Sequence, residues 1–257
     1  MTTTTLPQPH NGHPPLPSLP IPQVEEECPD LGMVLSPSQT KTFLTCPARW
    51  CYKYLQGLAD PPTGALVLGT SVHTAIGANF SQKILTKRDL DPADVRENFR
   101  HAWREKVREA TLRDDEDPGD LEELGAALVD HYMREAAPAI QPAAVELPVA
   151  GEIAGVQVRG FIDLVEADGR IVDLKTAAKR PAGINPGYKF QLTTYDLLCP
   201  QSRGQARLDT LVKTKTVQLI QQSTEIGPSD VRYAEAVYPM VQDAIRDGIF
   251  YPRRESN

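Results

Sequence analysis

Residues 160–176 read GFIDLVEADGRIVDLKT, and this stretch decides the fold. Two apolar runs flank Asp168-Gly169, a pair that is typical of the tight turn between antiparallel strands. Asp173 and Lys175 stand two positions apart, so their side chains point to the same face of the second strand. An unpaired charge in an apolar strand is costly, so both side chains need partners.

The length of the turn decides whether Asp163 joins this pair. A two-residue loop would turn Asp163 to the opposite face of the hairpin. A three-residue loop over residues 168–170 would place Asp163 opposite Lys175, with Asp173 on the same face. Because Gly169 can supply the left-handed conformation that such a loop needs, we predict a loop of odd length, or a bulge, that brings the three side chains together.

Two carboxylates that converge with a lysine are typical of a divalent-metal site. Carboxylate oxygens are the ligands that Mg²⁺ prefers, and a neighbouring lysine can orient or polarise an attacking water. The alternative is a buried Asp173–Lys175 pair that only fixes the register of the strands. These residues alone leave both interpretations open.

The order of the remaining elements predicts a tail followed by one α/β domain with a helical N-terminal insertion or cap. Residues 1–30 hold eight of the 23 prolines, which is typical of a disordered Pro-rich tail. The domain, residues 31–257, divides into a helical part over about 36–137 and an α/β core over about 142–250. Capping signals and periodicity predict these elements: helices from Ser36 and over 66–84, 92–110, 118–135, 186–198 and 229–247, and strands over 145–149, 156–165, 171–176 and 210–221, the last as one strand or a hairpin.

Composition excludes several classes of protein. The 257 residues are 40% hydrophobic and 24% charged, as in a globular chain. No run approaches the ~20 apolar residues that span a bilayer. Residues 1–23 contain no Lys or Arg, so a secretory signal is not expected, and four cysteines without such a signal favour a reducing compartment. We therefore expect a cytoplasmic protein with no membrane partner.

The charge is unevenly distributed. The net charge is −7, but residues 89–136 carry 15 acidic and 7 basic side chains, net −8, whereas residues 171–215 carry 8 basic and 3 acidic side chains, net +5. A local basic surface that includes Lys179 and Lys189 can bind phosphates even on an acidic protein. The charge therefore does not exclude DNA, although both stretches can also be ordinary solvated surfaces.

Three weaker signals accompany the central motif. Gln191 and Tyr195 are four positions apart on a predicted helix and share a face from which they can hydrogen-bond phosphate or a base, but an ordinary amphipathic helix has the same pattern. His73 lies between two glycines, which suggests space for a ligand, although a single histidine on an apolar face is more often a core residue. Glu146, in the first β-rich run, is a further acidic group of the site or an edge residue.

Taken in order, the motifs resemble the PD-(D/E)XK nuclease superfamily, in its RecB-like branch. The resemblance covers residues 35 to 252 and consists of these segments: Leu35–Ser38 with Cys46-Pro47, Tyr52 and Tyr54; Gly69–His73; Gly160–Asp163; Asp173–Thr176; and Gln191–Tyr195. It implies a restriction-endonuclease-like core, in which helices flank a central mixed β-sheet, with a helical N-terminal cap.

The resemblance also implies roles for single residues. It implies three side-chain metal ligands and one backbone ligand, namely His73, Asp163, Asp173 and the carbonyl of Leu174. Asp163, Asp173 and Lys175 are then the catalytic set, in which Lys175 acts on the nucleophilic water. Gln191 and Tyr195 face the substrate.

The implied reaction is hydrolysis of DNA phosphodiester bonds with Mg²⁺ or Mn²⁺. We expect a deoxyribonuclease, exonuclease-like, of DNA repair, recombination or phage-type DNA processing. Because the sequence has no glycine-rich phosphate loop, it carries no visible ATPase motor, and a separate helicase or recombination protein is an expected partner. The alternatives are a non-catalytic nucleic-acid-binding subunit of a helicase–nuclease complex that keeps the fold, and a structural protein whose acidic helices bind a partner.

The cysteines bear on one further cofactor. Many RecB-like relatives hold an iron–sulfur cluster with one cysteine in the first helix and three near the C-terminus. Cys46 matches the first position, but this sequence lacks the other three, and its cysteines at 28, 46, 51 and 199 are not spaced for a cluster. We therefore expect no iron–sulfur cluster, and we interpret Cys46 and Cys51 as small buried apolar side chains.

Overall fold

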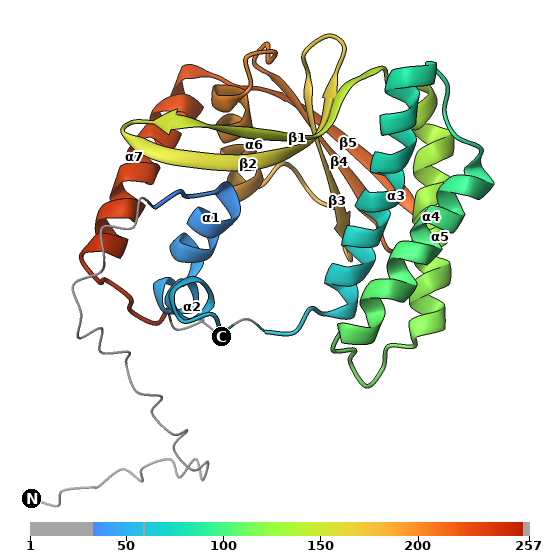
Figure 1. Ribbon diagram of the computed structural model, residues 1–257, viewed down its shortest axis with the longest axis horizontal. Helices are drawn as coiled ribbons and strands as arrows, with labels where there is room; N and C mark the ends of the chain where they lie inside the picture. Colours follow the sequence, from blue (N-terminus) through green and yellow to red (C-terminus); the bar gives the residue numbers. More distant parts are fainter. Residues whose placement is uncertain (1–32, 59, 254–257) are drawn as a thin grey trace, which may run out of the picture.

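The computed structural model describes residues 33–58 and 60–253, so the tail predicted for residues 1–30 lies outside the described residues. A five-stranded sheet forms the centre, in the order β1-β2-β3-β4-β5 (Figure 1). Only β3 and β4 pair in parallel, so the predicted central mixed sheet is confirmed. The strands are β1 (Pro142–Ile153), β2 (Val156–Glu166), β3 (Ile171–Ala177), β4 (Gln205–Val212) and β5 (Gln218–Glu225).

Most helices begin where the sequence places a capping residue before a proline. The side chains of Ser36, Asp91, Asp117 and Asn185 each accept a hydrogen bond from a backbone N–H of the first turn, and a proline follows each of them. The helices are α1 (Pro37–Thr45), α2 (Pro47–Trp50), α3 (Gly64–Thr86), α4 (Pro92–Lys106), α5 (Pro118–Glu135), α6 (Pro186–Leu198) and α7 (Pro228–Arg246). A π-helical turn (Cys51–Leu55) extends α2, and 3₁₀ turns (Val107–Glu109 and Ala137–Ala139) follow α4 and α5.

Helices cover both faces of the sheet. Helices α3, α4 and α5 form one layer, whose core joins Phe99 and Tyr132 to Leu174 of β3 (Figure 1). Helix α6 covers the other face, and α7 packs with α1 beneath the far end of the long β1–β2 hairpin. Helices α4 and α5 carry many charged side chains, and each buries an apolar face. No helix of the described residues is long and apolar enough to cross a membrane.

The β2–β3 turn has the predicted odd length but a different register. Val165 pairs with Ile171, and the N–H of Glu166 donates to the carbonyl of Arg170, so the loop is 167–169 rather than 168–170. Arg170 lies between this loop and β3: its backbone carbonyl closes the turn, and its guanidinium contacts both Glu166 and Asp168. Gly169 takes the expected left-handed conformation, with φ of 87°.

The shifted register changes the partner of Asp163. Continuing the pairing by one step brings Asp163 opposite Asp173, so the predicted position opposite Lys175 was wrong. The three side chains still gather on one face, as predicted. Relative to the predicted register, the partner of each β2 residue moves by two positions along β3, and side chains two positions apart lie on the same face of a strand. The region predicted as one strand or a hairpin over 210–221 is the β4–β5 hairpin, which begins five residues earlier than the predicted strand.

A buried charge network ties the sheet to α5. The guanidinium of Arg207 lies between the carboxylates of Asp209, at 2.7 Å, and Glu166, at 2.8 Å. The hydroxyl of Tyr132 donates to Asp209 at 3.0 Å, and the Gln221 amide donates to the same carboxylate at 3.2 Å. One cation therefore satisfies two carboxylates that have little access to water.

We expect Arg207→Gln to lower the free energy of unfolding by about 3–5 kcal/mol, because it leaves the buried Asp209 without its cation and Glu166 with only the longer contact to Arg170. The matched change Arg246→Gln removes an exposed ion pair to Asp243 and should cost less than about 1 kcal/mol. Urea unfolding of both variants measures the difference. Equal, small losses would show that the network adds nothing to stability.

Candidate active site

Strand β2 pairs with β1 along its length, but on its other edge it changes its partner at the site. Its first half pairs with Leu35, the residue before the cap of α1, through a bridge to Val158. Its second half pairs with β3 only at Leu164 and Val165. Between these two partners the carboxylate of Asp163 accepts a hydrogen bond from the N–H of Leu174, at 2.8 Å. A side chain thus satisfies the β3 backbone at the point where the two strands separate.

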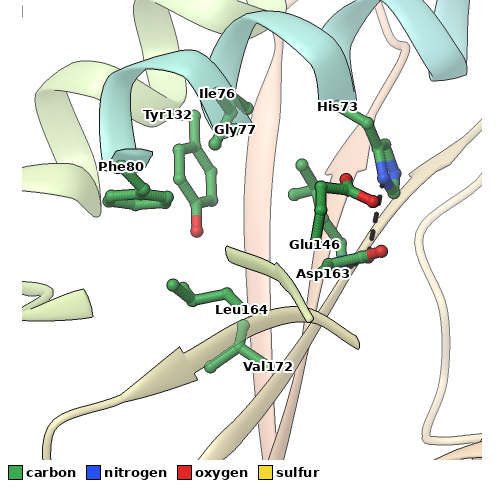
Figure 2. Close-up of a pocket in the computed structure, with 10 residues that line it drawn as sticks. His73, Ile76, Gly77, Phe80, Tyr132, Glu146, Asp163, Leu164 and Val172 are labelled. Carbon is green, nitrogen blue, oxygen red and sulfur yellow. Dashed lines mark hydrogen bonds and ion pairs between the residues drawn. The ribbon is translucent and has the colours of Figure 1, made fainter. Parts of the chain in front are cut away.

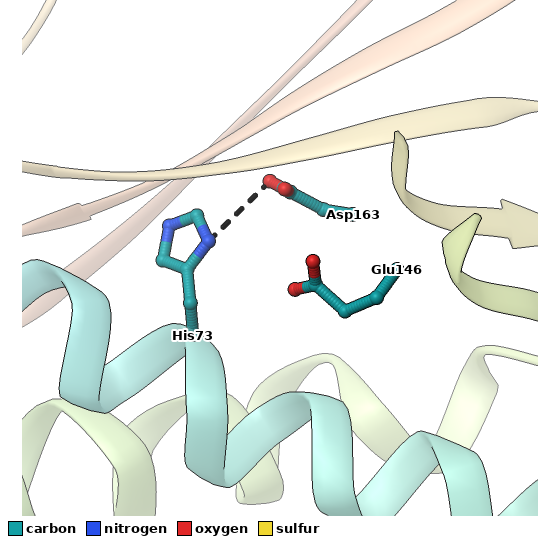
Figure 3. A group of neighbouring side chains, drawn as sticks. All are labelled: His73, Glu146 and Asp163. Atoms are coloured by element: carbon teal, nitrogen blue, oxygen red, sulfur yellow. Dashed lines mark ion pairs between the residues drawn. The ribbon is translucent and has the colours of Figure 1, made fainter. Parts of the chain in front are cut away.

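Three side chains from three elements, one of them Asp163, form a candidate metal site (Figure 3). They are His73 of α3, Glu146 of β1 and Asp163 of β2, and one ligand atom from each lies within 4.8 Å of the others. His73 Nδ1 is 3.5 Å from Asp163 Oδ2. Two carboxylates and an imidazole fit a divalent cation such as Mg²⁺ or Mn²⁺.

Glu146 reaches this cluster through an unusual backbone conformation. Its φ is 47°, which is rare for a residue with a side chain and rarer still within a strand. Val145 and Leu147 keep the regular pairing with β2, whereas Glu146 itself leaves the ladder. Burial and the charge of Asp163 raise the pKa of Glu146. Strain of this kind concentrates at functional sites, which favours Glu146 as a residue of the site rather than of the edge.

A second cluster lies on β3 and α6. Lys175 Nζ is 2.7 Å from Asp173 Oδ2, and this buried oxygen accepts no hydrogen bond of good geometry from the described residues, so the contact is an ion pair. The Gln191 amide donates to Asp173 Oδ1 and to the hydroxyl of Tyr195, both at 3.0 Å. The structure therefore brings together four of the residues predicted from the sequence.

Electrostatic coupling joins the two clusters. Burial raises the pKa of Asp173 to about 6, with the Lys175 charge opposing and the Asp163 charge adding to the shift. Burial alone would also raise the pKa of Asp163, but its contact with His73 and the charge of Lys175 hold it below the usual value. The Lys175 pKa is raised, because the two aspartates outweigh burial. Asp163 is thus the common neighbour of both clusters.

The ligand set differs in one respect from the set that the sequence implied. The structure groups Glu146 with His73 and Asp163, whereas the Asp173 carboxylate contacts Lys175 and Gln191. Leu174 contributes its N–H to Asp163. The ligand roles of Asp173 and of the Leu174 carbonyl stay predictions.

A small apolar cavity lies next to the candidate metal site formed by His73, Glu146 and Asp163 (Figure 2). Phe80 of α3, Tyr132 of α5 and Val172 of β3 line it, together with His73 and Asp163. Apolar walls exclude water from one side of the charged groups, which strengthens their mutual interactions.

The two lysines predicted to bind substrate occupy different surroundings. Lys189 donates to Thr224 and the Glu225 carbonyl and lies 3.3 Å from Asp230, so it ties α6 to β5 and α7. The geometry gives it a structural role and does not bring it to the site. Lys179 is exposed in the segment that follows β3.

Sequence reasoning missed a lysine and a tyrosine beside the Asp173–Lys175 pair. Lys41 Nζ of α1 lies 4.5 Å from the centre of the Tyr188 ring, and Lys175 Nζ lies 5.6 Å from the same centre. Burial and the Lys175 charge lower the pKa of Lys41. Lys41 falls inside the Ser36–Pro47 segment, but no local pattern marks it, because its neighbours come from α6 and β3.

Comparisons with known proteins bear on the family and the fold of the chain. The sequence model of the PD-(D/E)XK nuclease superfamily matches residues 34–255. No curated protein matches the chain. The crystal structure of a candidate exonuclease from Eubacterium rectale has a TM-score of 0.59 at 14% identity, with 87% of this chain and 85% of that chain covered. The structure of SSO0001 has a TM-score of 0.34 at 12% identity, covering 80% and 86%.

The E. rectale structure shares the fold, and the family match spans nearly all of the described residues. The fold, the Asp173–Lys175 pair on β3 and the neighbouring carboxylates are consistent with that match. The chain belongs to the PD-(D/E)XK nuclease superfamily.

Proposed function

We propose that the protein is a metal-dependent deoxyribonuclease of the RecB-like branch. The observation that carries the proposal is the meeting of a carboxylate–imidazole cluster with a buried Asp173–Lys175 pair at the point where β2 leaves β3. A cluster that only stabilised the fold would not require the strained backbone of Glu146. Phosphodiester hydrolysis is the chemistry that this arrangement supports best.

His73, Glu146 and Asp163 would hold the metal, Mg²⁺ or Mn²⁺, with Asp173 as a further ligand. When bound, such an ion stabilises negative charge on phosphoryl oxygens and lowers the pKa of a bound water. Lys175 orients the attacking water and offsets charge on the phosphate, and Asp173 fixes the position of its ammonium group. Gln191 holds Asp173 in place from α6, and the Tyr195 hydroxyl accepts a second hydrogen bond from the same amide.

The substrate approaches from the side of α1 and of the loop after β3. Lys41 and Tyr188 stand next to Lys175, and a phosphate placed there would relieve the repulsion between the two lysines. Lys179 adds a cation at the exposed end of β3. We infer an exonuclease-like enzyme of DNA repair, recombination or phage-type DNA processing, which works in the cytoplasm and with a separate helicase or recombination protein.

We expect Asp173→Asn and Lys175→Ala each to lower the rate of DNA cleavage by on the order of 100-fold or more, because each removes a charge that acts on the transition state. End-labelled linear DNA and closed circular DNA, each with and without Mg²⁺, measure cleavage and separate exonuclease from endonuclease action. Asp243→Asn and Lys53→Ala, at exposed positions, are the matched controls.

Cleavage by both variants at the wild-type rate would show that the assigned site is wrong. DNA binding without turnover of any DNA form by the wild type would support the non-catalytic subunit instead.

We expect the cleavage rate to fall as the pH is lowered through about 6. The raised pKa of Asp173 means that its carboxylate gains a proton in this range, and Lys175 then loses its partner. A bound cation competes with that proton, so the midpoint should move to lower pH as the Mn²⁺ concentration rises. Initial rates between pH 5 and 8 at two Mn²⁺ concentrations test this, and a flat profile contradicts it.

Glu146→Gly should separate stability from metal binding. Glycine adopts a φ of 47° without strain, so the free energy of unfolding should stay level or rise by about 1 kcal/mol. Loss of a ligand should weaken Mn²⁺ binding by roughly tenfold or more. Titration calorimetry with Mn²⁺ and urea unfolding in EDTA measure the two effects.

Glu152→Gly, at an exposed position of the same strand, is the control for this experiment. It should lower stability, because glycine weakens a strand, and leave Mn²⁺ affinity unchanged. Unchanged affinity in Glu146→Gly would remove Glu146 from the metal site.

A further inference from the structure

A groove of about 520 Å³ lies along α3 and includes the candidate metal site in its lining. His73, Glu146 and Asp163 are among its lining residues, together with Lys106, the last residue of α4. The groove opens to solvent over an exposed stretch of α3. Its volume lies in the range of sites that hold small molecules or one segment of a larger one.

The lining of the groove includes hydroxyl groups and one lysine. Thr74 and Ser81 present hydroxyls from α3, and Lys106 Nζ donates to Thr74 Oγ1 at 3.4 Å. Among the described residues, no carboxylate lies within ion-pair distance of Lys106. The ammonium group is therefore held at the groove by a weak contact and keeps its capacity to bind an anion.

Gly77 and Ala78 keep the groove open. A Cβ atom built on Gly77 would have Val145 Cγ1, at 3.7 Å, as its nearest neighbour, which is ordinary van der Waals contact. Packing against β1 therefore does not require glycine, although a glycine inside a helix lowers its stability. Space for a ligand explains this residue better than packing does.

We propose that the groove binds the sugar–phosphate backbone of the substrate on one side of the scissile bond, with Lys106 bound to the neighbouring phosphate. Lysine ammonium groups and hydroxyls are typical donors to phosphate, whereas the described residues that line the groove include no Phe, Tyr or Trp ring on which a base could stack. The inference rests on the proposed nuclease function. It adds a second phosphate contact, separate from Lys41.

Binding and cleavage of a fluorescent single-stranded DNA oligonucleotide test the proposal. In a Lys175→Ala background, which blocks turnover, Lys106→Gln should raise the Kd in Mn²⁺ about five- to tenfold and lower the slope of log Kd against log salt by about one. With Lys175 intact, the same change should raise KM. Lys53→Gln, an exposed lysine on the turn after α2, is the matched control.

Gly77→Ala is a second variant, and it should weaken DNA binding while it stabilises the fold. The substitution should raise the temperature of unfolding, since it removes a glycine from a helix. The added methyl group should still raise the Kd severalfold, because it occupies space on the groove wall. Weaker binding therefore cannot be attributed to a damaged fold. A Kd equal to that of the parent in both Lys106→Gln and Gly77→Ala would overturn the proposal.

The outcomes separate this proposal from the proposed function. Wild-type protein that cleaves DNA, with groove variants that bind normally, would refute the groove alone. Protein that binds DNA through Lys106 but never cleaves it would refute the nuclease and leave the groove in place. Protein that neither binds nor cleaves DNA in Mn²⁺ would refute both.

Discussion

The structure depends on one constraint, the burial of an opposite-charge pair on the face of an apolar central strand. Asp173 is 1% exposed, and its pairing with Lys175 must offset the loss of hydration of both groups. The Gln191 amide of α6 donates a hydrogen bond to the Asp173 carboxylate and another to the hydroxyl of Tyr195. A side chain at position 160 would meet the Tyr195 ring at 2.7 Å, so Gly160 is required for α6 to approach β2 this closely.

The division of β2 between two partners converts this pair into a site. A regular sheet would have continued the β2–β3 ladder past Leu164 and left no open edge. Here the carboxylate of Asp163 replaces a strand hydrogen bond, and Glu146 adopts a strained conformation on the other neighbour of β2. The fold gives up regular pairing and backbone relaxation at the same point, which is the pattern expected where function competes with stability.

Local signals in the sequence account for much of the fold. Caps such as Ser36 and Asn185, each followed by proline, locate helix starts because they satisfy N–H groups of the first turn without help from distant residues. The odd turn at Gly169 could also be predicted, because its conformation is a property of three residues. The exact register could not, because it depends on whether Arg170 contacts Glu166 or stays in the loop.

The parts of the site that escaped prediction depend on contacts between distant segments. Nothing near Lys41 in the sequence indicates Tyr188, and nothing near Lys189 indicates that β5 and α7 hold its ammonium group. The sequence offered Glu146 only as one of two alternatives, since its conformation arises from pairing on both sides of it. Charge and motif can thus nominate residues, but topology decides which of them share a site.

The electrostatics of the site imply an order of binding. Without a cation, Glu146 and Asp163 lie close together, and their repulsion contributes to the raised pKa of Glu146. The same carboxylates would repel a phosphate in the groove that they border. A divalent cation removes both repulsions at once, so metal binding should precede the binding of nucleic acid. Lys41, beside Tyr188, and Lys106, in the groove, have no ion pair with these carboxylates in the described part of the chain, so in the proposed enzyme both lysines would attract the substrate backbone and leave the carboxylates to the metal.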